Sequence, residues 1–327
     1  MNPVPMTFAP ILKPKVWGGR RLADYGKDLG AMDAVGESWE LADLPDSIEE
    51  GRSVVDSGPL AGKTLHALLE EDSSWIMGRA SCSDEGGFPL LIKYLDARED
   101  LSMQVHPDEQ WVRSHPEDHL KTESWIILEA EEGAMLYKGI RPGVDPDAFA
   151  RAIEDGSVVD LVEVVPARVG DCHDLPSGTC HALGKGILVA EIQTPSDTTF
   201  RVFDWGRTDR TLHIEQALQC IAFEPAAKTE AYERTRHGSA QVTRLSKTPH
   251  YLIDRIDAVD ADVITLQIGD APEVLMMLAG EGSLEGQPGP GLEKGRTVLI
   301  PAAMESVELR LTANASLLRV TLPPAEN

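Results

Sequence analysis

The sequence is poor in cysteine and contains no long apolar run. Four cysteines occur in 327 residues (Cys82, Cys172, Cys180 and Cys220), and none forms a CxxC pair. Neither a disulfide framework nor a zinc site built from thiolates is therefore indicated. No apolar stretch approaches the ~20 residues that a membrane-spanning helix requires, and residues 1–6 lack the basic start and apolar core of a signal peptide. We expect a cytoplasmic protein that does not associate with a membrane.

Basic residues are also scarce, with 30 Lys and Arg against 54 Asp and Glu and a net charge of −24. This balance excludes a general nucleic-acid-binding surface, which needs a basic footprint. It does not exclude a phosphorylated small molecule, because a few local Lys and Arg residues are enough to bind one phosphate. The length exceeds that of a usual single core, so two domains or one large β assembly are expected.

The most informative stretch runs from Leu101 to Glu123. Successive side chains of a strand point to opposite faces, so Gln104 and His106 face the same way. Pro107 removes a backbone donor and ends this strand. Glu123 then begins an apolar run, residues 124–128, that indicates a returning strand. An imidazole, a carboxamide and a carboxylate on two strands are three candidate ligands of a metal ion.

A fourth candidate is His181, which follows a Pro/Gly turn between two predicted strands at residues 170–183. Two imidazoles and two oxygen ligands suit Zn²⁺, and the set has no thiolate of the kind that makes a closed structural zinc site. Two His with one carboxylate equally suit a non-haem Fe(II) site. Each residue could instead be a hydrogen-bonded core residue, which is how we interpret the other histidines.

Most of the chain has the pattern of strands, and two segments have the pattern of helices. Strands are predicted at residues 36–41, 89–96 and 187–193. Thr64 is a candidate N-cap for a helix that ends near Asp72. Asp145 and Pro146 begin a short helix that Gly156 closes, inside an otherwise β-patterned region.

The C-terminal third contains a faint internal repeat of this region. The run that begins at Glu273 resembles the run at Glu123, and Gly295 to Pro301 repeats the spacing of Gly170 to Pro176. In the first copy His181 lies five residues after Pro176, whereas in the second copy Ser306 lies five residues after Pro301. The repeat predicts two barrel-like halves, of which only the first keeps the histidine.

Four segments together resemble the type I phosphomannose isomerase family in its short bacterial form. They are residues 89–108, Lys121-Thr122-Glu123, residues 176–182 and residues 196–202, and the resemblance extends from Phe8 to Phe223. It implies a mainly β fold of two cupin-type jelly-roll barrels with a short helical insertion. It also implies a zinc-dependent enzyme of mannose metabolism that interconverts mannose 6-phosphate and fructose 6-phosphate. We expect a catalytic domain over residues 1–224 and a degenerate jelly-roll domain over residues 225–327.

The resemblance also implies roles for individual residues. The family's zinc ligands correspond to Gln104, His106, Glu123 and His181, with Gln104 the weakest of the four. Its active-site arginine corresponds to Arg201, and Ser102 and Lys121 line the substrate site. Lys93, Trp17 and Glu40 lie in stretches similar to the family's pocket. The sequence departs from the family pattern at Ser177 and Cys180, where Ala and an aliphatic residue are expected.

The general base and the partners are less constrained by the sequence. Glu191, Lys93 and Lys121 are candidate bases, because burial and neighbours can tune either a carboxylate or a lysine. Arg207 and Arg210 are interpreted as surface residues. The expected partner is a phosphorylated hexose, and the chain is expected to be a monomer or a small homo-oligomer. Two alternatives stay open: a different metal enzyme on the same cluster, such as an Fe(II) oxygenase, and a sugar-phosphate-binding cupin without catalysis.

Overall fold

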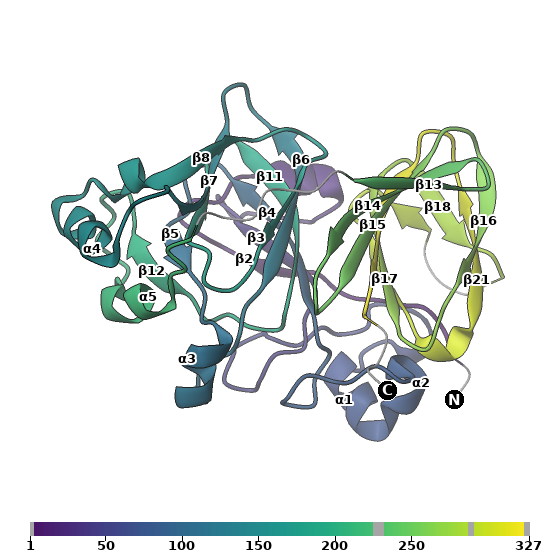
Figure 1. The fold of residues 1–327 in the computed structure, drawn as a ribbon. Helices are drawn as coiled ribbons and strands as arrows, with labels where there is room; N and C mark the ends of the chain where they lie inside the picture. Colours follow the sequence, from purple (N-terminus) through teal and green to yellow (C-terminus); the bar gives the residue numbers. More distant parts are fainter. Residues whose placement is uncertain (1–2, 225–231, 287–290, 324–327) are drawn as a thin grey trace.

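Strands account for most of the regular structure, as their sequence pattern predicts. The computed structural model describes residues 3–224, 232–286 and 291–323, and within them the strands form four sheets. Figure 1 shows that these sheets make two lobes, one from the first two-thirds of the chain and one from the C-terminal third. None of the described helices has the length and apolarity to cross a membrane.

Two sheets build the first lobe. The six-stranded sheet has the order β2-β3-β4-β11-β6-β9: β2 (Ile11–Lys13), β3 (Glu37–Leu41), β4 (Leu91–Ala97), β11 (Ile187–Gln193), β6 (Glu123–Ala130) and β9 (Cys172–Leu175). The five-stranded sheet has the order β12-β5-β10-β7-β8: β12 (Phe200–Phe203), β5 (Met103–Val105), β10 (His181–Leu183), β7 (Met135–Ile140) and β8 (Val162–Pro166). Trp125 and Ile127 of one sheet share a buried cluster with Leu136 and Leu183 of the other, so the two sheets face each other across one core.

The second lobe repeats this arrangement. Its seven-stranded sheet has the order β1-β20-β17-β22-β15-β14-β13: β1 (Met6–Thr7), β20 (Thr297–Ile300), β17 (Glu273–Ala279), β22 (Ser316–Thr321), β15 (Leu252–Ala258), β14 (Ala240–Lys247) and β13 (Glu233–His237). The four-stranded sheet is β16 (Asp262–Gln267), β21 (Ser306–Leu311), β18 (Glu281–Leu284) and β19 (Leu292–Glu293). Leu275 and Leu317 pack with Ile264 and Leu309 between these sheets. This architecture of two jelly-roll lobes confirms the predicted fold class.

Helices lie at the periphery of the sheets (Figure 1). They are α1 (Leu65–Asp72), α2 (Ser74–Met77), α3 (Glu109–Ser114), α4 (Pro146–Asp155) and α5 (Ile214–Cys220), with 3₁₀ turns η1 (Arg21–Tyr25), η2 (Gly58–Leu60), η3 (Val158–Leu161) and η4 (Ala302–Met304). The two predicted helices are confirmed with their caps: the Thr64 and Asp145 side chains accept from the backbone N–H three residues on, and Gly156 ends α4 at a φ of 81°. Helices α2, α3 and α5 are additional to the predicted helices, and each spans fewer than eight residues.

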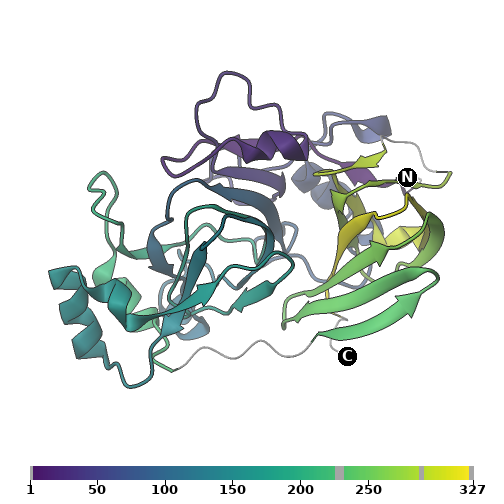
Figure 2. The same cartoon turned by 90° about the horizontal axis from the view of Figure 1, so that it is seen from above.

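The six-stranded sheet uses its two faces for different purposes. On β6, Trp125 and Ile127 belong to the core between the sheets of the first lobe, whereas Ile126 belongs to a cluster on the opposite face. That second cluster also contains Tyr251 and Ile253 of the second lobe. The alternation of β6 therefore turns one face toward the interior of its own lobe and packs the other on the seven-stranded sheet. Figure 2 shows the two lobes side by side from above.

Strand pairing confirms the internal repeat. Glu123 pairs with Leu175, the residue before Pro176, and Glu273 pairs with Ile300, the residue before Pro301. The two copies therefore have the same register. In the second copy the Glu273 carboxylate accepts from the Arg319 guanidinium, at 2.6 Å from its Nε. An internal cation thus satisfies the carboxylate of the copy that has no histidine.

The predicted boundary between residues 224 and 225 lies at the edge of residues 225–231, which are outside the described residues. The division into domains 1–224 and 225–327 stays a prediction. The two lobes do not divide the chain at a single point, because β1, at the beginning of the chain, pairs with β20 and so belongs to the second lobe's sheet.

Candidate metal centre and active site

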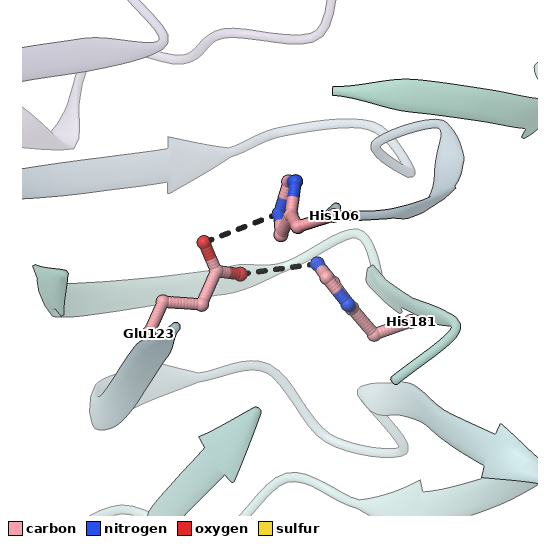
Figure 3. A group of neighbouring side chains, drawn as sticks. All are labelled: His106, Glu123 and His181. Atoms are coloured by element: carbon pink, nitrogen blue, oxygen red, sulfur yellow. Dashed lines mark ion pairs between the residues drawn. The ribbon is translucent and has the colours of Figure 1, made fainter. Parts of the chain in front are cut away.

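Three of the predicted ligands meet between the two sheets of the first lobe (Figure 3). Glu123 is the first residue of β6 in the six-stranded sheet, and His181 is the first residue of β10 in the five-stranded sheet. His106 follows β5 directly. Their candidate ligand atoms all lie within 4.8 Å of one another. The site therefore depends on both sheets, which hold residues that are far apart in the sequence.

The three side chains are buried and point at a common centre. The Glu123 oxygens lie 3.0 Å from His181 Nε2 and 3.4 Å from His106 Nε2. His106 Nε2 and Glu123 Oε1 are buried without a hydrogen-bond partner among the described residues, and the Lys121 ammonium lies 2.9 Å from Glu123 Oε2. Unpaired buried polar atoms are costly, and a metal ion bound between these side chains would satisfy them.

Hydrogen bonds at the other ring nitrogens fix the tautomer of both histidines. His106 Nδ1 lies 2.9 Å from the Thr198 carbonyl oxygen, and His181 Nδ1 lies 2.8 Å from that of Thr179. A carbonyl can only accept, so each Nδ1 carries a proton, and in the neutral ring each Nε2 then keeps its lone pair. Both Nε2 lone pairs are therefore available to a metal ion, and the carbonyls orient the rings toward it.

Electrostatics keep these ligands in the forms that bind a metal. Burial, with a further effect of the Lys121 ammonium, lowers the pKa of His106 to about 3, so the ring is neutral near pH 7. Burial opposes the ionisation of Glu123, but Lys121, at 2.9 Å, and the two histidines hold its pKa well below the usual range. Two imidazoles and one carboxylate match the N/O donor set of zinc.

The position of Gln104 fits a fourth ligand. Gln104 pairs with His181 across β5 and β10, and its side-chain nitrogen lies 3.4 Å from His181 Nε2. The oxygen and nitrogen of a carboxamide are interchangeable by rotation about its last bond. Such a rotation would turn the Gln104 oxygen toward the same centre.

A cavity of about 420 Å³ adjoins the cluster. Gln104 and Lys121 both line this cavity and contact the cluster. The other lining residues are Lys13, Lys15, Trp17, Glu37, Trp39, Leu91, Lys93, Leu95, Leu101, Ser102, Trp125, Glu191, Ser196, Asp197, Thr199, Arg201 and Arg210. Six of the lining side chains are cationic, which suits an anionic ligand despite the net negative charge of the chain.

Arg201 differs from the other cations of the cavity. Lys13, Lys15, Lys93, Lys121 and Arg210 each make an ion pair with a carboxylate. Arg201 makes none with the described residues: one terminal nitrogen donates to the Thr211 carbonyl at 2.9 Å, and its buried Nε has no partner. Burial, followed by the charge of Arg210, lowers the pKa of Arg201, and an incoming anion would relieve both effects.

A buried row of charges crosses the wall of the cavity. The Lys93 ammonium lies 3.0 Å from Glu191 and 3.6 Å from Glu37. Two indoles hold the carboxylates: Trp125 donates to Glu191 at 2.9 Å, and Trp39 donates to Glu37 at 2.7 Å. The two carboxylates differ in basicity. Burial and the charge of Glu123 raise the pKa of Glu191, whereas Lys93 and Lys15 overcome burial and lower the pKa of Glu37 to about 2.

Comparison with known proteins agrees with this geometry. The family model "Phosphomannose isomerase type I, catalytic domain" matches residues 7–135. A mannose-6-phosphate isomerase of Streptococcus mutans is 33% identical over 311 residues, which cover 92% of this chain and 94% of that protein. The chain belongs to the type I phosphomannose isomerase family.

Two solved structures of mannose 6-phosphate isomerases share the fold. The crystal structure of the mannose 6-phosphate isomerase from Bacillus subtilis has a TM-score of 0.87 and 28% identity, and the match covers 97% of this chain and 99% of that one. A zinc-bound mannose 6-phosphate isomerase has a TM-score of 0.77 over 98% of this chain and 99% of that one. At 15% identity this second match supports the fold alone.

The structure brings most of the predicted site residues to this cavity. Arg201, Lys121, Glu191, Ser102, Lys93 and Trp17 all line it. Glu40 does not: its carboxylate accepts from the Lys27 ammonium at 2.7 Å and from Ser38 at 2.6 Å, both in the buried interior. The reason is the alternation of β3, because Glu37 and Trp39 face the cavity and Ser38 and Glu40 face away. The acid that β3 brings to the cavity is Glu37.

Arg210 is also not the surface residue that the sequence predicts. It lines the cavity and donates to the buried Asp204 carboxylate, as Arg207 does. The two-residue period of this strand places Glu37 and Glu40 on opposite faces, but it does not show which face lines the cavity. Arg210 lies in the loop after β12, where no periodicity shows the direction of a side chain.

Proposed function

We propose that this chain is a zinc-dependent isomerase that interconverts mannose 6-phosphate and fructose 6-phosphate. The observation that carries this proposal is the buried group of His106, Glu123 and His181, whose ligand atoms converge beside a cationic cavity. Membership of the family supplies the substrate class, and the cavity is large enough to hold a hexose phosphate. The enzyme would act through a cis-enediol, with a proton moved between C1 and C2.

The metal would be held by His106, Glu123 and His181, with Gln104 as a fourth ligand. Bound zinc would supply Lewis acidity, which polarises a carbonyl and stabilises the negative charge that develops on oxygen. The two backbone carbonyls behind the histidines keep the Nε2 lone pairs directed at the ion.

The residues of the cavity would divide the remaining tasks. Glu191 is our candidate base, because it is buried, its pKa is raised and it lies beside the substrate space. Lys93 holds the Glu191 carboxylate in place at 3.0 Å. Arg201, which has no carboxylate partner among the described residues, would bind a substrate oxygen or the phosphate. Ser102 and Lys121 would bind further oxygens of the sugar phosphate, and Trp17 would cover the ring.

A cytoplasmic location is part of the proposal. All four cysteines are free thiols, and three of them are buried. Free thiols are expected in a reducing compartment. The phosphorylated hexose that the enzyme would use is also an intracellular type of metabolite.

A coupled assay that follows fructose 6-phosphate formed from mannose 6-phosphate tests the function directly. We expect turnover with about one zinc per chain, loss of turnover after chelation, and recovery on addition of zinc. Arg201→Ala should remove most of the turnover, at least 100-fold, because removal of one electrostatic stabiliser costs about 10²–10³.

Arg113→Ala is the matched control, because Arg113 is an exposed arginine of α3 that pairs only with Glu109 among the described residues. It should leave turnover unchanged. Full turnover in the Arg201 variant, or bound iron together with oxygen consumption, would contradict the proposal.

A further inference from the structure

A buried hydrogen-bond network lies directly behind the metal ligand Glu123. The Ser124 hydroxyl donates to the Asp174 carboxylate at 2.6 Å, and the Ser246 hydroxyl donates to the same oxygen at 2.7 Å. The Tyr251 hydroxyl lies 3.0 Å from that of Ser124. Ser124, Ser246 and Tyr251 are buried, with exposed fractions of 0%, 4% and 0%.

This network connects the two lobes. Ser124 belongs to β6 and Asp174 to the neighbouring β9, and the two residues pair directly in the six-stranded sheet. Ser246 belongs to β14, and Tyr251 precedes β15, in the second lobe. In Figure 1, β14 and β15 lie on the side of the second lobe that faces the first. The polar contact sits within an otherwise apolar interface that includes Ile126 and Ile253.

The position of Ser124 relates this contact to the metal centre. Consecutive residues of a strand face opposite sides, so the Glu123 carboxylate points to the cluster while the Ser124 hydroxyl points to the second lobe. Among the residues that the structure describes, none from the second lobe lines the cavity. Any influence it has on the site therefore passes through strands such as β6.

We propose that the second lobe positions the metal ligand Glu123, and that Tyr251 and Ser246 are the positioning residues, acting through Ser124 and Asp174. A buried polar network fixes the relative position of the groups it joins, because a shift would leave buried donors and acceptors unpaired. Apolar contacts in the same interface are not directional, so they hold the two lobes together but do little to fix the position of one lobe relative to the other. This inference rests on the proposed zinc site.

The test compares a variant without the network with a variant that loses only apolar contact. Tyr251→Phe combined with Ser246→Ala removes two hydroxyls from the second lobe and leaves Glu123, Ser124 and Asp174 in place. Ile253→Val is the matched control, since the Ile253 side chain is apolar and fully buried in the same interface and the substitution leaves its backbone pairing in place. Single Tyr251→Phe keeps the ring and serves if the double variant does not fold.

The readout is the zinc dissociation constant, measured by competition with a chelator well below the melting temperature. There the protein is fully folded, so a loss of stability alone does not change this constant. Groups bonded directly to metal ligands alter metal affinity by about 10–100-fold, so we expect a weakening of about three- to tenfold for these more distant groups. Ile253→Val should lower the melting temperature and leave the zinc dissociation constant equal to that of the wild type.

Two results would overturn the inference. One is a lower melting temperature with unchanged zinc affinity in the double variant, and the other is equal weakening by Ile253→Val. A wild-type chain that binds no zinc would overturn the proposed function itself, and this inference with it.

Discussion

At the scale of single residues, the site is explained by which partner each charged group has. His106 and His181 give their Nδ1 protons to backbone carbonyls, which leaves both Nε2 atoms for a metal ion. Five of the six cations in the cavity have a carboxylate partner, and Arg201 has none among the described residues. The sequence shows the type of each residue but not its partner. Pairs such as Lys93–Glu191 join segments that are distant in the chain, and even the near neighbours Lys121 and Glu123 are brought together only by the direction of the backbone.

A prediction at this scale concerns Glu37 and pH. Its pKa falls from 4.5 to about 2 on folding, so the unfolded chain takes up the proton first. The stability that the Glu37 carboxylate contributes is therefore fully present above about pH 5 and is lost as the pH falls toward 2. Glu37→Gln should be less stable than wild type at pH 7, and the difference should shrink between pH 5 and pH 3.

Urea unfolding of both proteins at pH 7, 5 and 3, with chelator present throughout, measures this difference. Glu293→Gln, at an exposed position of β19, is the control and should track wild type at each pH. A difference between wild type and Glu37→Gln that does not change with pH would show that the carboxylate is not held by Lys93 and Lys15.

At the scale of elements, strand β6 contacts both the site and the second lobe. Its side chains alternate, so Glu123 and Trp125 face the site and Ser124 and Ile126 face the second lobe. The apolar run at residues 124–128 predicts a strand, and the structure confirms it. The sequence did not show what the outer face packs against, because a fully buried strand has apolar residues on both faces.

Ile126→Ala tests this packing. Ile126 is 1% exposed within the cluster that joins the lobes, so its truncation should lower the free energy of unfolding by about 2–5 kcal/mol. Val164→Ala on the edge strand β8, where the side chain is 40% exposed, should change it by less than about 0.5 kcal/mol. Denaturant titration measures both values. A similar small effect of the two substitutions would mean that the face between the lobes is not well packed.

At the scale of the whole molecule, the two lobes share their largest apolar cluster. That cluster combines Ile126 and Tyr94 of the first lobe with Tyr251, Val274 and Val320 of the second. The strand β1, at the beginning of the chain, pairs with β20 in the sheet of the second lobe. These contacts couple the lobes, whichever residue is taken as the boundary between them.

Thermal unfolding should therefore show one transition rather than two. A scanning calorimetry trace of the zinc-loaded chain is expected to fit a single transition, and chelation should move the whole transition to lower temperature, because zinc would bind only the folded state. Two separate transitions, of which only one responds to zinc, would contradict this coupling. The oligomeric state, predicted to be monomer or small homo-oligomer, should be measured on the same samples.

The sequence by itself determined the local structure and the chemical types at the site. Strand alternation placed Gln104 and His106 on one side, the caps at Thr64 and Asp145 began their helices, and the repeat aligned Glu273 with Glu123. These features depend on neighbours in the chain, and the residue types report them directly. Tertiary structure decided the rest: that Glu37 rather than Glu40 enters the cavity, that Arg210 joins it from a loop, and that the second lobe lies behind Glu123. Those outcomes depend on how strands from distant segments pair and which face each one buries, and no local pattern encodes them.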